Sequence, residues 1–418
     1  MRIQTLLNRV HPLKSFVYAA CRLELRNAGP VLVAKIRPRL NGKVLCSGCG
    51  IARPLYDRRD ERCFDFVPLW NIPVCLEYRM RRVDCPECGV KVEKVPWADG
   101  KSHTTKALQL FLARWARKLS WKETAESFGT SWDTVFRSVK AVVAYGMARR
   151  NLAGIEAIGV DEVQYRKGHQ YLTLVYQIDE GMRRLLFVGQ ERKAKTLLRF
   201  FKEFGEERSR RLRFVCSDMW KPYLKVIAKK VPHVLHVLDR FHIIQHLNKA
   251  VNQVRIDEVK KLKQDGYDEE VLRHTKYCFL KNPENLTDKQ QVKLDDVLEY
   301  DLKSVRAYQL KESFQLFWIY TSPYWAEWYL EKWCARAMRS RLDPIKGFVK
   351  TIRRHQPLIM NWFKAKKAYS SGVVEGLNRK VNLVTRRAFG FRSYESLKIA
   401  LFHTMGELPE PELTHRFS

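Results

Sequence analysis

One segment of this chain, residues 155–240, alternates strand-like and helix-like stretches in a fixed order, and this order constrains the fold most strongly. Five stretches have the composition of strands. Two further stretches, one before and one after the fourth strand, have the apolar spacing of helices. The five predicted strands contain the sequences IEAIGVDEVQY, QYLTLVYQID, RRLLFVGQ, RLRFVCSD and HVLHVLDR. The order β-β-β-α-β-α-β, a possible meander followed by two strand–helix units, predicts an α/β sheet of the ribonuclease-H-like type.

Two carboxylates end strands that should be neighbours in such a sheet. Asp161 ends the first predicted strand, and Asp218 ends the fourth. The first and fourth strands of a ribonuclease-H-like sheet lie side by side, so the two side chains should meet at one edge. A single aspartate at a strand end is more often a turn or capping residue, and the interpretation therefore needs a third acid.

Glu375 is the candidate for the third acid, on a predicted helix. An apolar stripe at helical spacing indicates the face that packs on the sheet, and Glu375 falls on the other face. The stripe consists of Val374, Leu377, Val381 and Val384. We expect polar and basic residues of the same helix to contact DNA: Asn378, Arg379, Asn382, Arg386 and Arg387.

Three converging carboxylates suit metal-dependent phosphodiester chemistry. Two Mg2+ (or Mn2+) ions about 3.5–4 Å apart can generate the attacking oxygen and stabilise the leaving one. Hard cations prefer oxygen ligands, and without metal the three acids would repel one another. Two other acids compete for these roles. Glu162 should point away on the opposite face of its strand, whereas Asp239 is a candidate to support the ligands or to position His242.

Two CxxC pairs, each followed by glycine, predict a structural zinc site. Two knuckles of this kind can supply four thiolates in tetrahedral arrangement. The predicted ligands are Cys46, Cys49, Cys85 and Cys88. A redox CxxC is the alternative, which the second knuckle disfavours.

The residues around the second knuckle have less specific interpretations. Cys63 and Cys75 are expected to be core or spare thiols. A basic run near the second knuckle suits phosphate contact, although it is also typical of a solvated face. It comprises Arg79, Arg81 and Arg82.

Residues 120–140 are typical of a helix-turn-helix. Ser120 and Glu123 can form a capping box, and Gly129 permits a sharp turn before a second helix. An ordinary helical hairpin shares the pattern. We expect four residues of the second helix to face a DNA groove: Trp132, Thr134, Arg137 and Ser138.

The charge balance favours a polyanionic partner. The chain has 77 lysines and arginines against 45 acids, a net charge of +32, and basic residues that neutralise phosphates drive nucleic-acid binding. No apolar run approaches the roughly 20 residues of a membrane span, and the N-terminus lacks the features of a signal peptide. We therefore expect a protein of the reducing cytoplasm.

These features predict a multidomain α/β chain with four parts. Residues 1–40 look like a basic lead-in with one strand at 31–36, and residues 241–360 are almost entirely helical. Four tryptophans of that helical part suggest core packing, with base stacking as the alternative: Trp318, Trp325, Trp328 and Trp333. The predicted parts are a zinc module (1–98), a helix-turn-helix (99–150), a ribonuclease-H-like catalytic domain (151–240 and 365–407) and an all-helical insertion (241–364).

The sequence resembles the bacterial insertion-sequence transposases of the IS-L-three family, in the DDE class. The resemblance depends on the cysteine knuckles CSGC and CPEC, on ETAESFGTSWDTV, and on four later motifs taken together: IGVDEVQYRKGHQYLTLV, CSDMWKPY, VLDRFHI and GVVEGLNRKVNLVTRRAFGFRSY. It implies a Mg2+-dependent enzyme that cleaves and transfers double-stranded DNA at the terminal inverted repeats of its element, paired as at least a homodimer. Its catalytic acids correspond to Asp161, Asp218 and Glu375.

Two other functions remain open from sequence. One is a non-catalytic DNA-binding regulator that uses only the zinc module and the helix-turn-helix. The other is a structure-specific nuclease on the same fold. The regulator does not explain three acids at matching positions, and the nuclease does not explain two DNA-reading modules.

Overall fold

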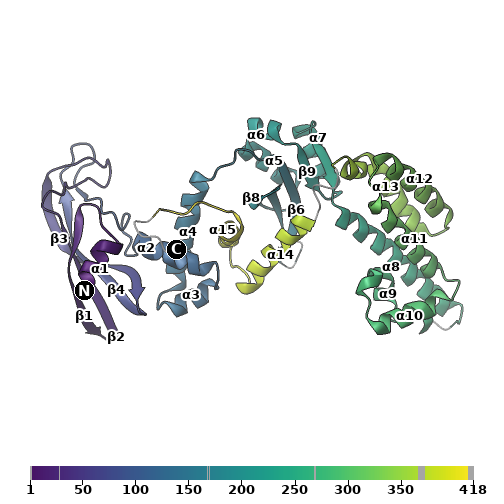
Figure 1. The fold of residues 1–418 in the computed structure, drawn as a ribbon, viewed down its shortest axis with the longest axis horizontal. Helices are drawn as coiled ribbons and strands as arrows, with labels where there is room; N and C mark the ends of the chain where they lie inside the picture. Colours follow the sequence, from purple (N-terminus) through teal and green to yellow (C-terminus); the bar gives the residue numbers. More distant parts are fainter. Residues whose placement is uncertain are drawn as a thin grey trace. The chain divides into compact units, whose positions relative to one another are not determined.

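The computed structural model describes residues 2–27, 29–166, 168, 170–267, 270–365 and 372–412. The chain forms two compact units (Figure 1), one comprising Met1–Asn151 with Asn382–Ser418 and the other Leu152–Val381. The division falls inside helix α14 (Gly372–Arg387). The segment 365–407, assigned from sequence to the catalytic domain, is therefore shared between the units.

A five-stranded sheet opens the first unit, after the short helix α1 (Ile3–Val10). The strand order is β1-β2-β4-β3, with β5 on β4, and the β2–β4 pair is parallel. The strands are β1 (Phe16–Arg26), β2 (Gly29–Pro38), β3 (Leu55–Leu69), β4 (Ile72–Val83) and β5 (Lys91–Val92). The expectation of a single strand within residues 1–40 is wrong, because β1 pairs with β2 along ten residue pairs.

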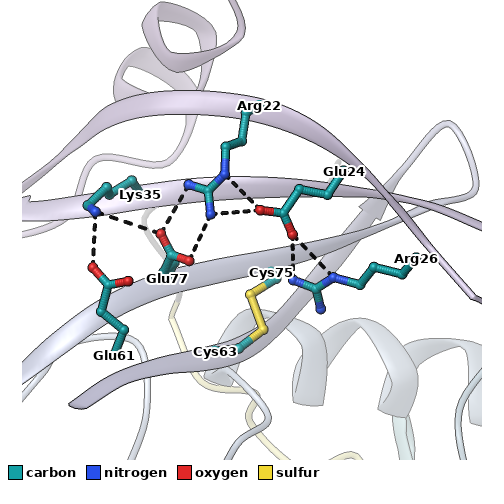
Figure 2. Close-up of polar contacts among 8 residues, drawn as sticks. All are labelled: Arg22, Glu24, Arg26, Lys35, Glu61, Cys63, Cys75 and Glu77. Atoms are coloured by element: carbon teal, nitrogen blue, oxygen red, sulfur yellow. Dashed lines mark hydrogen bonds and ion pairs between the residues drawn. A yellow bond between two sulfur atoms is a disulfide. The ribbon is translucent and has the colours of Figure 1, made fainter.

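Charged residues of β1 take part in a network across the exposed face of this sheet (Figure 2). Arg22 contacts Glu77 of β4 at 2.9 Å and Glu24 of its own strand at 2.7 Å. Lys35 of β2 joins Glu61 and Glu77 at 3.0 and 3.9 Å. Cross-strand pairs of opposite charge stabilise strand pairing, which explains how so charged a segment forms a strand.

The β3–β4 hairpin contains a disulfide between Cys63 and Cys75 (Figure 2). Cys63 is opposite Glu77 and Cys75 is opposite Asp65, so the two cysteines are diagonal neighbours with Cα atoms 5.6 Å apart. This distance is within the range for a disulfide. The expectation of two separate thiols is therefore wrong.

Three helices follow the sheet: α2 (Lys106–Ala116), α3 (Trp121–Ser127) and α4 (Trp132–Arg149). Ser120 and Glu123 form the expected capping box, and Ser131 caps α4. Gly129 has a φ of +59°, which only glycine adopts without strain.

The C-terminal helix α15 (Tyr394–Met405) packs on α4 within the same unit. Lys140 of α4 contacts Glu395 at 2.6 Å, and Arg114 of α2 contacts Glu410 at 2.9 Å. These contacts explain why the C-terminal segment groups with the helix-turn-helix rather than with the second unit.

The second unit contains a sheet with the predicted order of elements. β6, β7 and β8 form an antiparallel meander, and β9 and β10 extend it in parallel with β6, giving the order β10-β9-β6-β7-β8. Its strands are β6 (Ala157–Arg166), β7 (Gln170–Asp179), β8 (Met182–Gln190), β9 (Phe214–Ser217) and β10 (Leu235–Leu238). Its helices are α5 (Ala194–Phe204), α6 (Glu206–Arg211) and α7 (Lys221–Lys230).

The described residues from 240 to 364 contain helices and no strand. The α-helices are α8 (Arg240–Gln264), α9 (Lys276–Leu280), α10 (Asp288–Leu298), α11 (Lys303–Gln315), α12 (Pro323–Arg339) and α13 (Asp343–Lys364). Trp318 and Trp333 are buried in the core of these helices, whereas Trp325 and Trp328 are exposed on α12. The core expectation thus holds for two of the four tryptophans. Among the described residues, no helix is long and apolar enough to cross a membrane.

Candidate active site and metal centres

Three aspartates form a row across adjacent parallel strands of the second sheet. Gly159 of β6 pairs with Cys216 of β9, which in turn pairs with Val237 of β10. Two residues beyond each of these positions come Asp161, Asp218 and Asp239. Strand register therefore brings all three residues to the same level of the sheet. Asp218 and Asp239 directly follow β9 and β10, whereas the expectation that Asp161 ends its strand is wrong, because β6 continues to Arg166.

Both carboxylate oxygens of Asp161 accept hydrogen bonds. Oδ1 accepts the backbone N–H of Glu162 at 2.7 Å, and Oδ2 accepts a hydrogen bond from the Asn378 amide of α14. Asn378 in turn accepts the hydroxyl of the buried Tyr176 at 2.8 Å. This chain of bonds ties α14 to β6 and β7.

Asp218 pairs with an arginine that the sequence did not single out. Arg192 lies 2.9 Å from Asp218 and 2.7 Å from Glu162, and its guanidinium stacks over the Trp220 ring. The other Asp218 oxygen accepts the backbone N–H of Trp220 at 3.0 Å. Burial raises the pKa of Asp218, although the Trp220 N–H and Arg192 oppose the shift.

Glu162 belongs to this network, and the expectation that it simply points away from the site is wrong. Burial and the neighbouring Asp218 raise the pKa of Glu162 to about 7, despite the pairing with Arg192. Successive side chains of a strand point to opposite faces of the sheet, so Asp161 and Glu162 lie on different faces. The long side chain of Arg192 nevertheless joins Glu162 to Asp218.

Asp239 and His242 lie at the start of α8 and face Asp161. Asp239 caps the helix by accepting the Phe241 N–H at 2.7 Å. His242 Nε2 lies 3.6 Å from Asp161 Oδ1 and 3.8 Å from Asp239 Oδ2. Burial would lower the pKa of His242, but these carboxylates outweigh it and raise the pKa to about 9.

Glu375 lies on α14, one turn before Asn378, and forms an ion pair with Arg379 at 2.7 Å. All four residues of the predicted apolar stripe on this helix are buried. Potential ligand atoms of Asp161, Asp239 and His242 lie within 4.8 Å of one another. Neither Asp218 nor Glu375 belongs to that group.

The four cysteines of the two knuckles form a second cluster, in the first unit: Cys46, Cys49, Cys85 and Cys88. The sulfurs of Cys49 and Cys85 are 3.7 Å apart, close to the roughly 3.8 Å expected for two thiolates 2.3 Å from one tetrahedral zinc ion. At Gly48, between the first two cysteines, an added Cβ would lie 2.8 Å from the Cys88 sulfur. The donor set and the close backbone fit zinc.

The predicted DNA-reading residues of α4 differ in their surroundings. Trp132 and Arg137 are exposed, and Arg137 pairs with Asp133 one turn earlier. Thr134 is partly buried. Ser138 is buried and donates to the Thr134 carbonyl at 2.7 Å. The expectation that Ser138 faces a groove is therefore wrong.

The other predicted phosphate-binding residues also divide by their contacts. Arg81 is buried and paired with Glu93 at 2.7 Å, and Arg82 pairs with Asp57, so neither is free for phosphate. Arg387 donates to the Arg117 carbonyl at 2.9 Å, near the C-terminal end of α2. The following residues are exposed: Arg79, Arg379, Asn382 and Arg386.

Two family models match the chain, and both belong to the same protein family. A family model described as a transposase, of the ISL3 DDE type, matches residues 158–401. A second model, the helix-turn-helix domain of transposase family ISL3, matches residues 93–143.

Two curated relatives match most of the chain. The transposase for insertion sequence element IS1001 of Bordetella parapertussis is 26% identical over 84% of this chain and 86% of its own length. The transposase for IS1557 of Mycobacterium tuberculosis is 29% identical over 91% of this chain and 90% of its own length. Since the first family model alone covers more than half of the residues, the chain belongs to the ISL3 family of insertion-sequence transposases.

Proposed function

We propose that this transposase binds the terminal inverted repeats of its own element and cleaves and joins DNA strands there, using Asp161, Asp218 and Glu375 with two Mg2+ or Mn2+ ions. The observation that carries the proposal is the register of the parallel strands β6 and β9. It places Asp161 of β6 level with Asp218, which directly follows β9. Two acids fixed side by side by strand register can share metal ions, as phosphodiester chemistry requires.

The fold proposed for the catalytic domain is ribonuclease-H-like, interrupted by a helical insertion. The antiparallel meander β6–β8, extended in parallel by β9 and β10, supports this fold. Helix α8 leaves the sheet directly after Asp239, and α14 carries Glu375 back to β6, where Val374 packs against Gly159. The helices between them form the proposed insertion.

The chain's own residues bind and orient the reacting groups. Asp161, Asp218 and Glu375 would hold the ions, which when bound activate a water or hydroxyl nucleophile and stabilise the leaving oxygen. Asn378 holds Asp161 in place relative to α14. Arg192 pairs with Asp218 at 2.9 Å and offsets its charge.

We propose that DNA-end recognition uses the helix-turn-helix and that the cysteine cluster holds one structural zinc ion. The exposed Trp132 and Arg137 lie in the first two turns of α4, where a recognition helix contacts bases. Cutting two element ends requires them to be brought together, so the active form is at least a homodimer on double-stranded DNA, acting at the bacterial nucleoid.

The test compares Asp161→Asn and Asp218→Asn with Glu203→Gln, an acid of α5 outside the proposed site, on labelled duplexes that carry an element end. We expect cleavage to fall at least 1000-fold in both aspartate variants, with end binding unchanged and Glu203→Gln fully active. Cleavage near the wild-type rate in both variants would reject the site. A wild-type protein that binds without cutting would favour a regulator, and cutting independent of the repeat would favour a structure-specific nuclease.

A further inference from the structure

We propose that Asp239 and His242 are direct metal ligands and that, together with Asp161, they form an ion site in the DNA-free protein. This inference rests on the proposed metal-dependent function and assigns ligands outside its three acids. The three side chains come from two elements, the central strand β6 and the N-terminal turn of α8 with its capping residue Asp239.

The distances suit one ion between the three side chains. His242 Nε2 lies 3.6 Å from Asp161 Oδ1 and 3.8 Å from Asp239 Oδ2, too far for good hydrogen bonds. Two ligands at about 2.1 Å from one ion lie about 3.0 Å apart at a right angle and about 3.4 Å apart at a tetrahedral angle. Small rotations of these side chains would therefore bring all three ligand atoms within coordination distance of one ion.

The backbone holds the ligands ready. The Asp239 N–H donates to the Ser217 carbonyl at 2.8 Å, and the Asp239 carboxylate caps α8 through Oδ1, leaving Oδ2 on the His242 side. His242 follows three residues later, which places both side chains on one face of the helix. Both are largely buried, with 6% and 26% of their side chains exposed. Preorganised ligands lose little conformational entropy when they bind.

The other two acids are engaged elsewhere. Both oxygens of Asp218 accept hydrogen bonds, one from Arg192 and one from the Trp220 N–H. Glu375 is paired with Arg379 and is more exposed. Neither acid belongs to the group of potential ligand atoms within 4.8 Å of one another that Asp161, Asp239 and His242 form.

The donor set also predicts which ion binds. An imidazole nitrogen beside two carboxylates suits Mn2+ better than Mg2+, which prefers oxygen ligands and retains its water. We therefore expect DNA-free protein to bind one Mn2+ more tightly than Mg2+ at this site.

The experiment measures Mn2+ binding to the full-length, zinc-loaded, DNA-free protein by titration calorimetry and electron paramagnetic resonance. Asp239→Asn and His242→Gln should each weaken Mn2+ binding at least 10-fold, and Asn at position 239 keeps the helix cap. Glu375→Gln should change it less than twofold, and so should His246→Gln, the next histidine along α8. Spin-echo modulation from a coordinated nitrogen should disappear in His242→Gln and persist in His246→Gln. Thermal melts of each variant check that the fold is retained.

The opposite pattern overturns the inference. If Glu375→Gln weakens Mn2+ binding while folded Asp239→Asn and His242→Gln bind as the wild type does, Asp239 and His242 are not ligands. That result leaves the proposed function intact, because the function depends on loss of cleavage in Asp161→Asn and Asp218→Asn. If nitrogen modulation is lost in His242→Gln but Asp161→Asn and Asp218→Asn still cleave DNA at the wild-type rate, the proposed function is rejected instead.

Discussion

Val374 packs against Gly159 so closely that a Cβ at position 159 would lie 2.6 Å from Val374 Cγ2. Gly159 lies on β6 two residues before Asp161, and Val374 lies on α14 directly before Glu375. The absence of a side chain at Gly159 thus sets how closely the helix that carries Glu375 approaches the strand that carries Asp161.

Gly159→Ala should push α14 away from β6. We expect a loss of about 1–3 kcal/mol in the free energy of unfolding, as for other overpacked cores, and a fall in strand cleavage greater than the fall in DNA binding. Val374→Ala in the same chain should recover much of both losses, because it removes the clashing methyl groups. Urea unfolding and cleavage assays on the single and double variants measure the effect. Simple additivity of the two losses would contradict the packing argument.

Cys49→Ser should remove the metal from the cysteine cluster. Elemental analysis of the wild type should give one zinc per chain, and the variant should give close to none, with lower thermal stability of the first unit, because structural zinc contributes directly to folding. Cys21→Ser, on β1 and outside the cluster, is the matched control and should retain its zinc. Equal metal content in the two variants would exclude the cluster as a zinc site.

Arg137→Ala should weaken binding to the element's end by about 1–3 kcal/mol more than binding to random duplex, because a side chain that reads bases contributes only at its own sequence. Ser138→Ala, one residue further along α4, should leave DNA affinity unchanged, since its hydroxyl is bonded within the helix. Fluorescence anisotropy with both duplexes measures the difference. An equal loss on both duplexes in Arg137→Ala would mean that Arg137 contacts phosphate.

His403 should make the first unit sensitive to acid. Burial, with smaller contributions from Arg117 and Arg387, lowers the pKa of His403 from 6.5 to about 3. Between these values the unfolded chain binds more protons than the folded one, so stability present above pH 6.5 is lost as the pH falls. From pH 7 to pH 5 this residue should account for a loss of about 2 kcal/mol.

His403→Gln should flatten that part of the pH dependence, because glutamine does not titrate. Urea unfolding of both proteins at pH 7 and pH 5 isolates the contribution of the histidine, since the other titrating groups are common to both. Identical pH dependence in the two proteins would show that His403 is not buried in its neutral form.

Sequence patterns predicted the order of elements in the second sheet, because buried strands and amphipathic helices have distinct periods. The same patterns located Asp218 at a strand end and the buried stripe around Val374, but Asp161 lies within β6 rather than at its end. Strand β1 escaped prediction, since its charged residues are balanced by Glu77 and other partners on distant strands. Local composition does not contain that information.

Side-chain partners were the least predictable part of the site. Arg192 follows β8, whereas Glu162 lies on β6 and Asp218 follows β9. These residues meet only because the sheet brings distant parts of the chain together. The Cys63–Cys75 disulfide needs the exact hairpin register, which a one-residue slip would destroy. Ser138 was misassigned because its hydroxyl bonds to the preceding turn of its own helix, an option open to any serine in a helix.

The row of Asp161, Asp218 and Asp239 is complete before the chain enters α8 at Arg240. The registers of β6, β9 and β10 set its geometry, and none of the helices from α9 to α13 contributes a residue to it. Insertions or deletions within α9 to α12 would therefore leave the row unchanged, whereas α13 packs on β10, where the Asn361 amide donates to the His236 carbonyl at 2.8 Å. The helices between α8 and α13 can therefore change in length without changing the strand registers that place the three aspartates.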